Sequence, residues 1–217
     1  EVQYNADRAS RQKGGELEAR AALDSFMSAR GEEYSASISS PSAAWSHCSR
    51  LSPYLTFGHI SLRRVWHTLS AKQTEVRALK KGTAGGWPRS LSAAKARLKW
   101  RSHFMQKLED EPMMEKRCLC PSYEVLRTQS GDWNQQFYQA WATGLTGFPM
   151  VDACMRCLLQ HGWVNFRMRA MLVSFACYNL WLDWRGIAPH LARVFLDYEP
   201  GIHYPQLQMQ AGTTGIN

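Results

Sequence analysis

The chain has 217 residues, of which 45% are hydrophobic and 20% are charged. This composition is typical of a globular domain and excludes an intrinsically disordered chain. The 26 Lys and Arg outnumber the 18 Asp and Glu, so the formal net charge is +8. A surplus of this sign favours an anionic partner such as nucleic acid or phosphate. The most apolar stretch, residues 170–182, is too short for a bilayer and contains Ser174 and Asn179, so we expect no membrane span.

Six cysteines at irregular spacings, without a signal peptide before them, predict reduced thiols and a cytoplasmic location, or an organelle or nucleoid. Cys154, Cys157 and His161 would share one face of a helix. A zinc site needs a fourth ligand and ligands from a second element. We therefore predict no metal site.

Residues 1–13 are polar and predict a linker stub or a disordered end, followed by one helical domain over 14–217 that is cut before its C-terminal end. Apolar spacing predicts helices over 15–27, 53–69, 90–108, 133–143, 149–162, 165–185 and 189–196. The intervening stretches predict loops over 31–49, 80–89 and 109–132, and an irregular tail over 197–217. Since 165–185 is apolar almost all round, it should be the central buried helix. No stretch alternates as a strand does, so the predicted fold is all-α.

The segment Ser49-Arg50-Leu51-Ser52-Pro53 places two hydroxyls and a guanidinium before a helix start. Such groups, together with free N–H groups, can hold a phosphate. Taken alone, the segment is better explained by an ordinary capped helix with a surface arginine.

Arg169 lies among Met168, Ala170, Met171 and Leu172 in the helix expected to be buried. A buried guanidinium is costly unless an anion or several acceptors meet it. Asp197 is the best placed acid in a loop, so we expect an ion pair, a polar ligand, or both.

Several motifs occur in one order along the chain: SRLSPYL at 49–55, Trp100-Arg101, W-x-x-G-x-T-G-x-P-x-x-D-A-x-M-R at 141–156, Gly162-Trp163, Arg167-x-Arg169, Asp183-Trp184-Arg185 and a tail with Asp197, Gln208 and Ala211-Gly212. This ordered set resembles the helical flavin-binding domain of the photolyase/cryptochrome family. The resemblance implies an FAD cofactor. The positions that it assigns to FAD are Tyr34, Cys48, Ser49, Arg50, Leu51, Ser52, Arg101, Arg169, Asn179, Asp197, Glu199 and His203.

The resemblance also implies a pocket for damaged DNA. Trp100 and Trp163 match aromatic residues of the lesion pocket, while Arg97 and Phe166 replace a Glu and an Asn of the usual pattern. The family's antenna chromophore would bind an N-terminal domain that this chain lacks.

The positions of electron transfer differ from the usual pattern as well. Trp184 matches the middle tryptophan of the electron-transfer chain, but Leu207 replaces the one nearest the flavin. Photoreduction should then be slow, or pass through Trp181 or Tyr178. His203 aligns with the residue that faces the flavin N5, where an imidazole should exchange a proton near neutral pH.

Three functions fit these residues. A light-dependent DNA repair lyase is favoured by Trp100, Trp163 and the basic charge, with Trp184 and His203 also in catalytic positions. A cryptochrome-type photoreceptor without repair activity is favoured by the departures at positions 97, 166, 203 and 207. A helical nucleic-acid-binding module that has lost its flavin is the third.

Overall fold

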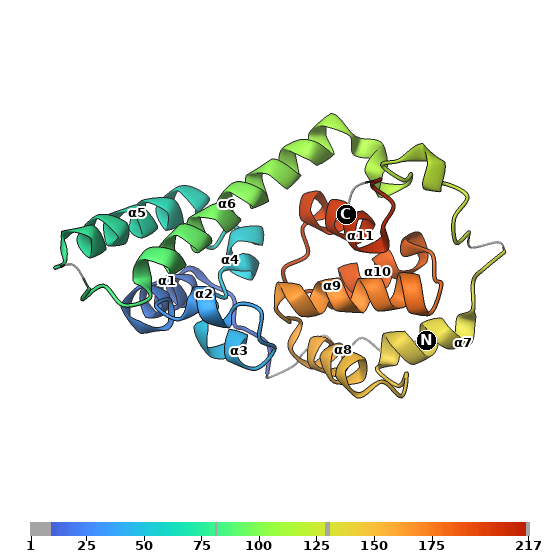
Figure 1. Ribbon diagram of the computed structural model, residues 1–217, viewed down its shortest axis with the longest axis horizontal. Helices are drawn as coiled ribbons and strands as arrows, with labels where there is room; N and C mark the ends of the chain where they lie inside the picture. The colour runs from blue at the N-terminus through green and yellow to red at the C-terminus, as the bar shows by residue number, and fades with distance from the viewer. Residues whose placement is uncertain (1–9, 81, 129–130, 216–217) are drawn as a thin grey trace. The chain divides into compact units, whose positions relative to one another are not determined.

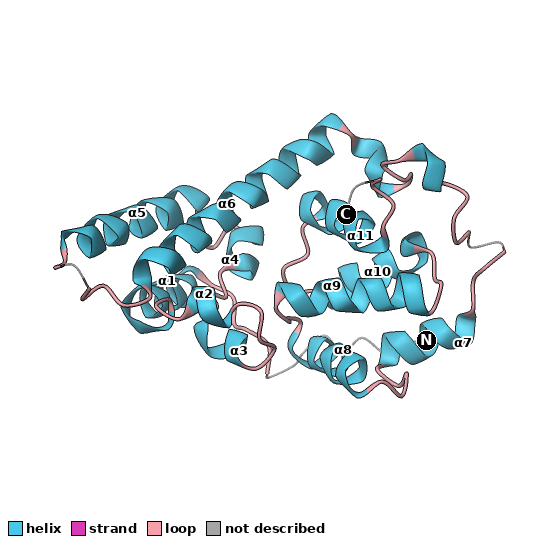
Figure 2. Cartoon of the chain, viewed as in Figure 1, coloured by secondary structure: helices cyan, strands magenta, loops and turns pink. Residues whose placement is uncertain are grey.

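The computed structural model describes residues 10–80, 82–128 and 131–215. Helices joined by loops make up these residues, and no strand occurs among them (Figure 2). The predicted all-α fold is therefore confirmed. Most of the predicted stub over 1–13 lies outside the described residues. The chain divides into two compact units, and Lys13–His103 form the first, here the N-terminal unit. Residues 10–12 and 104–215 belong to the second, the C-terminal unit.

The N-terminal unit contains α1 (Glu16–Ser25), the π-helical turn η1 (Phe26–Arg30), α2 (Tyr34–Ser37), α3 (Ala43–His47), α4 (Ser52–Thr56), α5 (Leu62–Ala78) and the first part of α6 (Trp87–Asp110) (Figure 1). Two predictions were wrong here. The expected loop over 31–49 contains α2 and α3, and the expected helix over 53–69 is two helices. Gly58 has a left-handed φ of 71°, which ends α4. Ser61 then starts α5, since its hydroxyl accepts from the Arg64 N–H at 3.2 Å.

The C-terminal unit contains the end of α6, the 3₁₀ turns η2 (Pro112–Glu115) and η3 (Pro121–Tyr123), α7 (Gln135–Thr143), α8 (Pro149–His161), α9 (Phe166–Ser174), the π-helical turn η4 (Phe175–Asn179), α10 (Trp184–Val194) and α11 (Pro200–Ala211). The predicted helix over 165–185 was wrong in its second half. Trp181 has a left-handed φ of 56°, and Asp183 caps α10 by accepting from the Arg185 N–H at 3.0 Å. These residues turn the chain, so α9 and α10 are separate helices.

The tail over 197–217 was predicted to be irregular, but α11 occupies most of it. Pro200 stands in the first turn, where a missing N–H costs nothing. Gly201 allows a close approach, because a Cβ there would lie 2.9 Å from the Met105 Cα. The proline and glycine that suggested a loop thus help to start and to seat a helix. The last two residues, 216–217, lie outside the described chain.

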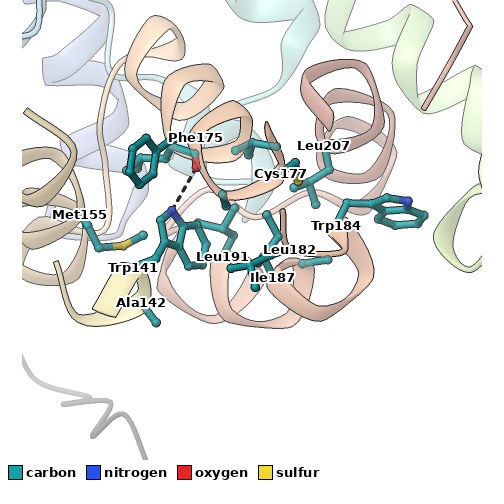
Figure 3. Close-up of a cluster of buried hydrophobic side chains, with 14 of the residues drawn as sticks. Trp141, Ala142, Met155, Phe175, Cys177, Leu182, Trp184, Ile187, Leu191 and Leu207 are labelled. Atoms are coloured by element: carbon teal, nitrogen blue, oxygen red, sulfur yellow. Dashed lines mark hydrogen bonds between the residues drawn. The ribbon is translucent and has the colours of Figure 1, made fainter. Parts of the chain in front are cut away.

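Trp141 is one of the largest side chains in the core of the C-terminal unit (Figure 3). The Trp141 indole is fully buried, and its N–H donates to the Leu172 carbonyl at 3.0 Å. Leu182, Ile187 and Leu191 pack in the same cluster. This hydrogen bond joins α7 to α9 and satisfies the one polar atom of a large buried ring.

The order T-G-x-P-x-x-D at residues 146–152 has a local structural role. Asp152 accepts from the Thr146 N–H and hydroxyl at 2.8 and 2.6 Å and from the Gly147 N–H at 2.9 Å. Burial alone raises the pKa of the Asp152 carboxyl, but these hydrogen bonds outweigh burial and lower it. The carboxylate thus fixes the turn that begins α8.

Gln208 ties α11 to the irregular stretch before η3. Its carboxamide accepts from the Leu119 N–H at 2.7 Å and donates to the carbonyls of Met114 and Arg117 at 2.7 and 2.8 Å. The side chain is fully buried, so each backbone group would lack a partner without it.

We predict that Gln208→Leu lowers the free energy of unfolding by about 3 kcal/mol or more, because three buried backbone groups lose their partner. Gln206→Leu is the matched control. The Gln206 side-chain oxygen is buried without a hydrogen-bond partner, so its removal should change stability by less than about 1 kcal/mol. Chemical denaturation of both variants measures the difference. Equal losses would contradict the role given to Gln208.

Candidate flavin site

The expected site residues fall in both units, so each set is described by itself. The N-terminal unit holds the loop Cys48–Leu51 between α3 and α4. Arg30 organises this loop, because its guanidinium donates to the carbonyls of Cys48, Ser49 and Ala22. Nothing in the sequence signalled this role, since the partners lie up to 19 residues away.

Arg50 occupies a strained position in the same loop. Its φ is 58°, in the left-handed region that side chains other than glycine rarely adopt, and its guanidinium stacks 4.4 Å from the Trp45 ring centroid. Strained residues of this kind cluster at ligand sites. Ser49 and Ser52 lie on either side of Leu51 and Arg50 in the chain and are half-buried, so this short segment carries two hydroxyls and one guanidinium.

Tyr34 and Cys48, two further residues expected to contact FAD, are buried in this unit. Burial raises the pKa of Tyr34 to about 12, with the Arg97 side chain close to its hydroxyl. Burial also raises the pKa of the Cys48 thiol to about 11, so this cysteine stays protonated at neutral pH. Leu51 is buried, Arg101 is half-buried, and Trp100 is 50% exposed. The ring of Trp100, which is expected to contact the lesion, is therefore accessible to solvent.

The C-terminal unit contains the predicted ion pair. The Arg169 Nη1 and Nη2 atoms donate to the two Asp197 carboxylate oxygens, each at 2.9 Å. The Arg169 Nε donates to the Val164 carbonyl at 2.8 Å, and the guanidinium lies 4.4 Å from the Phe195 ring centroid. The Asp197 side chain is 4% exposed and that of Arg169 is 24% exposed. The pairing is confirmed, although Arg169 is half-buried rather than buried.

His203 lies on α11 inside an aromatic enclosure. Its ring centroid is 5.1 Å from those of Tyr198 and Tyr204 and 6.4 Å from that of Phe195. The Nε2 atom lies 3.1 Å from the Ala188 carbonyl oxygen. Because a carbonyl only accepts, Nε2 carries the proton in the neutral ring and Nδ1 carries the lone pair.

The expectation that His203 exchanges a proton near neutral pH was wrong. Burial, with Arg169 adding to it, lowers the pKa of His203 to about 4, although the Ala188 carbonyl and Asp197 oppose the shift. The imidazole is therefore neutral at pH 7. It can accept a hydrogen bond at Nδ1 without adding a charge.

The other expected residues of this unit differ in exposure. Trp163 is buried, with 5% of its surface exposed, whereas Phe166 is 47% exposed. Asn179 is exposed at the end of η4, and Glu199 is half-buried before α11. A single pocket mouth formed by Trp100, Trp163 and Arg97 stays a prediction, since these residues belong to different units.

The electron-transfer positions lie in the core. Trp184 and Leu207 are each 2% exposed and belong to the hydrophobic cluster of Figure 3. Leu207 is an aliphatic side chain and cannot carry a radical. Tyr178 and Trp181 are 48% and 45% exposed. The buried Arg127 guanidinium lies 5.3 and 5.5 Å from their ring centroids. The route through these two rings stays a prediction.

A family model described as the FAD-binding domain of DNA photolyase matches residues 94–217. The chain belongs to this family. The deoxyribodipyrimidine photo-lyase of Streptomyces griseus is 31% identical over 93% of the chain, which covers 40% of that relative. FAD is thus the cofactor of the family, and the predicted resemblance is confirmed.

Solved structures agree with this assignment. A bacterial class III photolyase from Agrobacterium tumefaciens has a TM-score of 0.83 and 27% identity over 98% of this chain and 41% of its own. A cryptochrome from Synechocystis has a TM-score of 0.82 and 25% identity over 99% of this chain and 42% of its own. The chain therefore spans about two fifths of the length of these photolyase-family relatives.

Among the described residues of this photolyase-family domain, no group of three His, Cys, Asp or Glu could hold a metal ion. None of the described helices has the length and apolar character needed to cross a membrane.

We predict that Arg169→Gln lowers the free energy of unfolding by about 3 kcal/mol or more, because it leaves the buried Asp197 carboxylate without its charged partner. Arg117→Gln is the charge-matched control, because its side chain is exposed and lies in the same unit. That control should change stability by less than about 0.5 kcal/mol. Thermal and urea unfolding measure both, and similar effects at the two positions would contradict the structural role of the pair.

The pKa of His203 also predicts how stability depends on pH. The folded protein holds His203 neutral down to about pH 4, whereas the unfolded chain protonates it below its ordinary value near 6.5. Stability should therefore fall as the pH drops from 6.5 toward 4, by up to about 2 kcal/mol between pH 7 and pH 5. His190 is fully buried and its pKa is also lowered to about 4, so it adds a loss of the same sign.

In His203→Gln, whose amide can still donate to the Ala188 carbonyl, the loss between pH 7 and pH 5 should be about half as large. Gln206→Leu, on the same helix and without an ionisable side chain, should leave the pH profile unchanged. Urea unfolding at each pH provides the measurement. An unchanged profile in His203→Gln would show that this ring does not resist protonation.

Proposed function

We propose that the chain is the flavin-binding domain of a light-dependent DNA repair lyase that acts on pyrimidine lesions. The observation that carries the proposal is the bidentate Arg169–Asp197 pair together with neutral His203 on α11. All three residues lie inside the segment that the family model matches. The predominance of deoxyribodipyrimidine photo-lyases among the relatives supports the same conclusion. A protein with this function works where DNA is, in the cytoplasm, a nucleoid or an organelle.

The side chains present fit FAD. Arg50, Ser49 and Ser52 supply the donors that phosphate oxygens accept, on a loop that Arg30 holds in a strained conformation. Tyr34, Cys48 and Leu51 would contact FAD on the same side as that loop. Arg101 would contact it from α6. In the C-terminal unit, Arg169, Asp197 and His203 would meet the ring, with Asn179 and Glu199 near it.

When bound and reduced, FAD supplies the photoexcited electron that splits the lesion, and the protein supplies orientation and electrostatics. Arg169 would place one positive charge beside the ring, and Asp197 limits how much charge it adds because both carboxylate oxygens are engaged. His203 would offer the Nδ1 lone pair without a charge. Trp100 presents a half-exposed face on which a flipped base could stack, and Arg97, Trp163 and Phe166 complete the proposed DNA contacts.

A photoreceptor of cryptochrome type is the second candidate. The observation that favours it is the set of departures from the repair pattern at Arg97, Phe166, His203 and Leu207. The TM-score against the Synechocystis cryptochrome, 0.82, is only 0.01 below that against the photolyase, 0.83. A module that has lost its flavin is the third, and the colour of the purified protein distinguishes it.

The full-length protein should purify yellow, with flavin absorption, and should restore thymine in dimer-containing DNA under blue light but not in the dark. We expect Trp100→Ala to reduce repair at least tenfold while leaving flavin absorption unchanged, since its ring is the exposed stacking surface. Flavin absorption without any repair would support the photoreceptor instead. A colourless protein that binds DNA would support the third function.

A further inference from the structure

The positive charge of the chain is concentrated in one hairpin. The N-terminal unit carries 15 Lys and Arg against 6 Asp and Glu, whereas the rest of the chain carries 11 against 12. Within residues 62–103, which form α5, the connection and most of α6, there are 11 Lys and Arg and one acidic residue, Glu75. These residues are here called the α5–α6 hairpin. Its surplus exceeds that of the whole chain, so this hairpin is where an anionic partner is attracted most strongly.

Helices α5 and α6 lie side by side (Figure 1), and two lysines of α6 lie over a tryptophan of α5. The Lys95 Nζ is 4.3 Å and the Lys99 Nζ is 5.9 Å from the Trp66 ring centroid. Lys95 also donates to the Ser70 hydroxyl at 3.0 Å and to the Gln73 side-chain oxygen at 3.2 Å. Arg63 stands one turn before Trp66, on the same side of α5. We call Arg63, Trp66, Lys95 and Lys99 the Trp66 face.

The Trp66 face holds like charges together without an acid of its own. Lys95 and Lys99 are one helical turn apart, an arrangement that costs free energy through repulsion. Within the described parts of the chain, the partners of Lys95 are neutral and neither lysine forms an ion pair. The one acidic residue of the hairpin, Glu75, forms an ion pair with Lys72, with 2.9 Å between Nζ and Oε1. The charge of this face is therefore left for an anion from outside.

This face is separate from the positions that the flavin and the lesion would use. On an α-helix, Lys95 and Lys99 point about 160° away from Arg97 and Arg101 around the axis. Leu91 and Ala94, which are buried, lie between the two pairs. Arg97 adjoins Tyr34, on the side of the proposed site. The two pairs of cations, Lys95 with Lys99 and Arg97 with Arg101, thus lie on different sides of α6.

We propose that the Trp66 face binds the phosphates of duplex DNA away from the lesion, as a second contact surface. The cations stand on two helices, and a duplex offers a row of phosphates that several neighbouring cations can meet. α6 has 24 residues, a length of about 36 Å, close to one turn of duplex DNA. The inference rests on the DNA partner of the proposed function, but on neither the flavin nor the light reaction.

The test uses the full-length protein and an undamaged duplex. In Lys95→Gln/Lys99→Gln, affinity at moderate salt should fall roughly tenfold, and the slope of log K against log salt should decrease by about 2, because two phosphate contacts are lost. The preference for lesion-containing over undamaged duplex should not change, since both duplexes lose the same contacts. Flavin absorption and the melting temperature of the variant verify that the fold is intact.

The charge-matched control is Lys116→Gln/Arg117→Gln, two exposed residues of the C-terminal unit. If this control weakens binding as much as the first variant, net charge alone explains the effect and the inference is wrong. Binding to vesicles containing phosphatidylserine in place of duplex DNA would also overturn it. If Lys95→Gln/Lys99→Gln keeps both its repair activity and its DNA affinity, the DNA-binding role of the Trp66 face is contradicted and the proposed function is not. If the unsubstituted protein does not repair DNA, but the double substitution still lowers the salt dependence of DNA binding, the proposed function is contradicted and the role of the Trp66 face is not.

Discussion

The bidentate pair between Arg169 and Asp197 is the interaction on which the site of the C-terminal unit depends. The Asp197 side chain is 4% exposed, so its charge must be matched inside the fold. Arg169 matches it with both terminal nitrogens and uses its third nitrogen on the Val164 carbonyl. The pair therefore links α9 to the loop before α11. His203, six residues after Asp197, is positioned by the same link.

Polar side chains bound to backbone carbonyls hold α11 where the sequence predicted an irregular tail. Gln208 engages three backbone groups before η3, and the buried Arg127 donates to the carbonyls of Cys177 and Ala211. Arg127 thus joins the π-helical turn η4 to the end of α11. These anchors join segments 50 to 94 residues apart, so no local pattern can reveal them. Apolar packing alone would not fix the register of the tail so closely.

The sequence predicted the elements whose signals are local and missed those that depend on distant partners. Helices α7 and α8 were predicted to within two residues at each end, because Gly144, Pro149 and Gly162 mark three of their four ends. The Arg169–Asp197 pair was predictable from the cost of an unpaired charge. The break after η4 was not, because an apolar stretch does not show that Trp181 adopts a left-handed backbone. The protonation state of His203 also needed the structure, since burial among aromatic rings sets it.

The division of charge between the units fits two different physical demands. A photoexcited flavin needs a site whose charges are few, paired and fixed, because each unpaired charge in a low-dielectric interior shifts the energy of the ring. Paired Arg169 and Asp197 with neutral His203 meet that demand in the C-terminal unit, where 11 basic residues face 12 acidic ones over the chain outside Lys13–His103. A DNA backbone needs solvated, unmatched cations instead, since binding releases the counterions of the phosphates. In the proposed function, Lys95 and Lys99 of the α5–α6 hairpin would supply such cations, since neither forms an ion pair among the described residues.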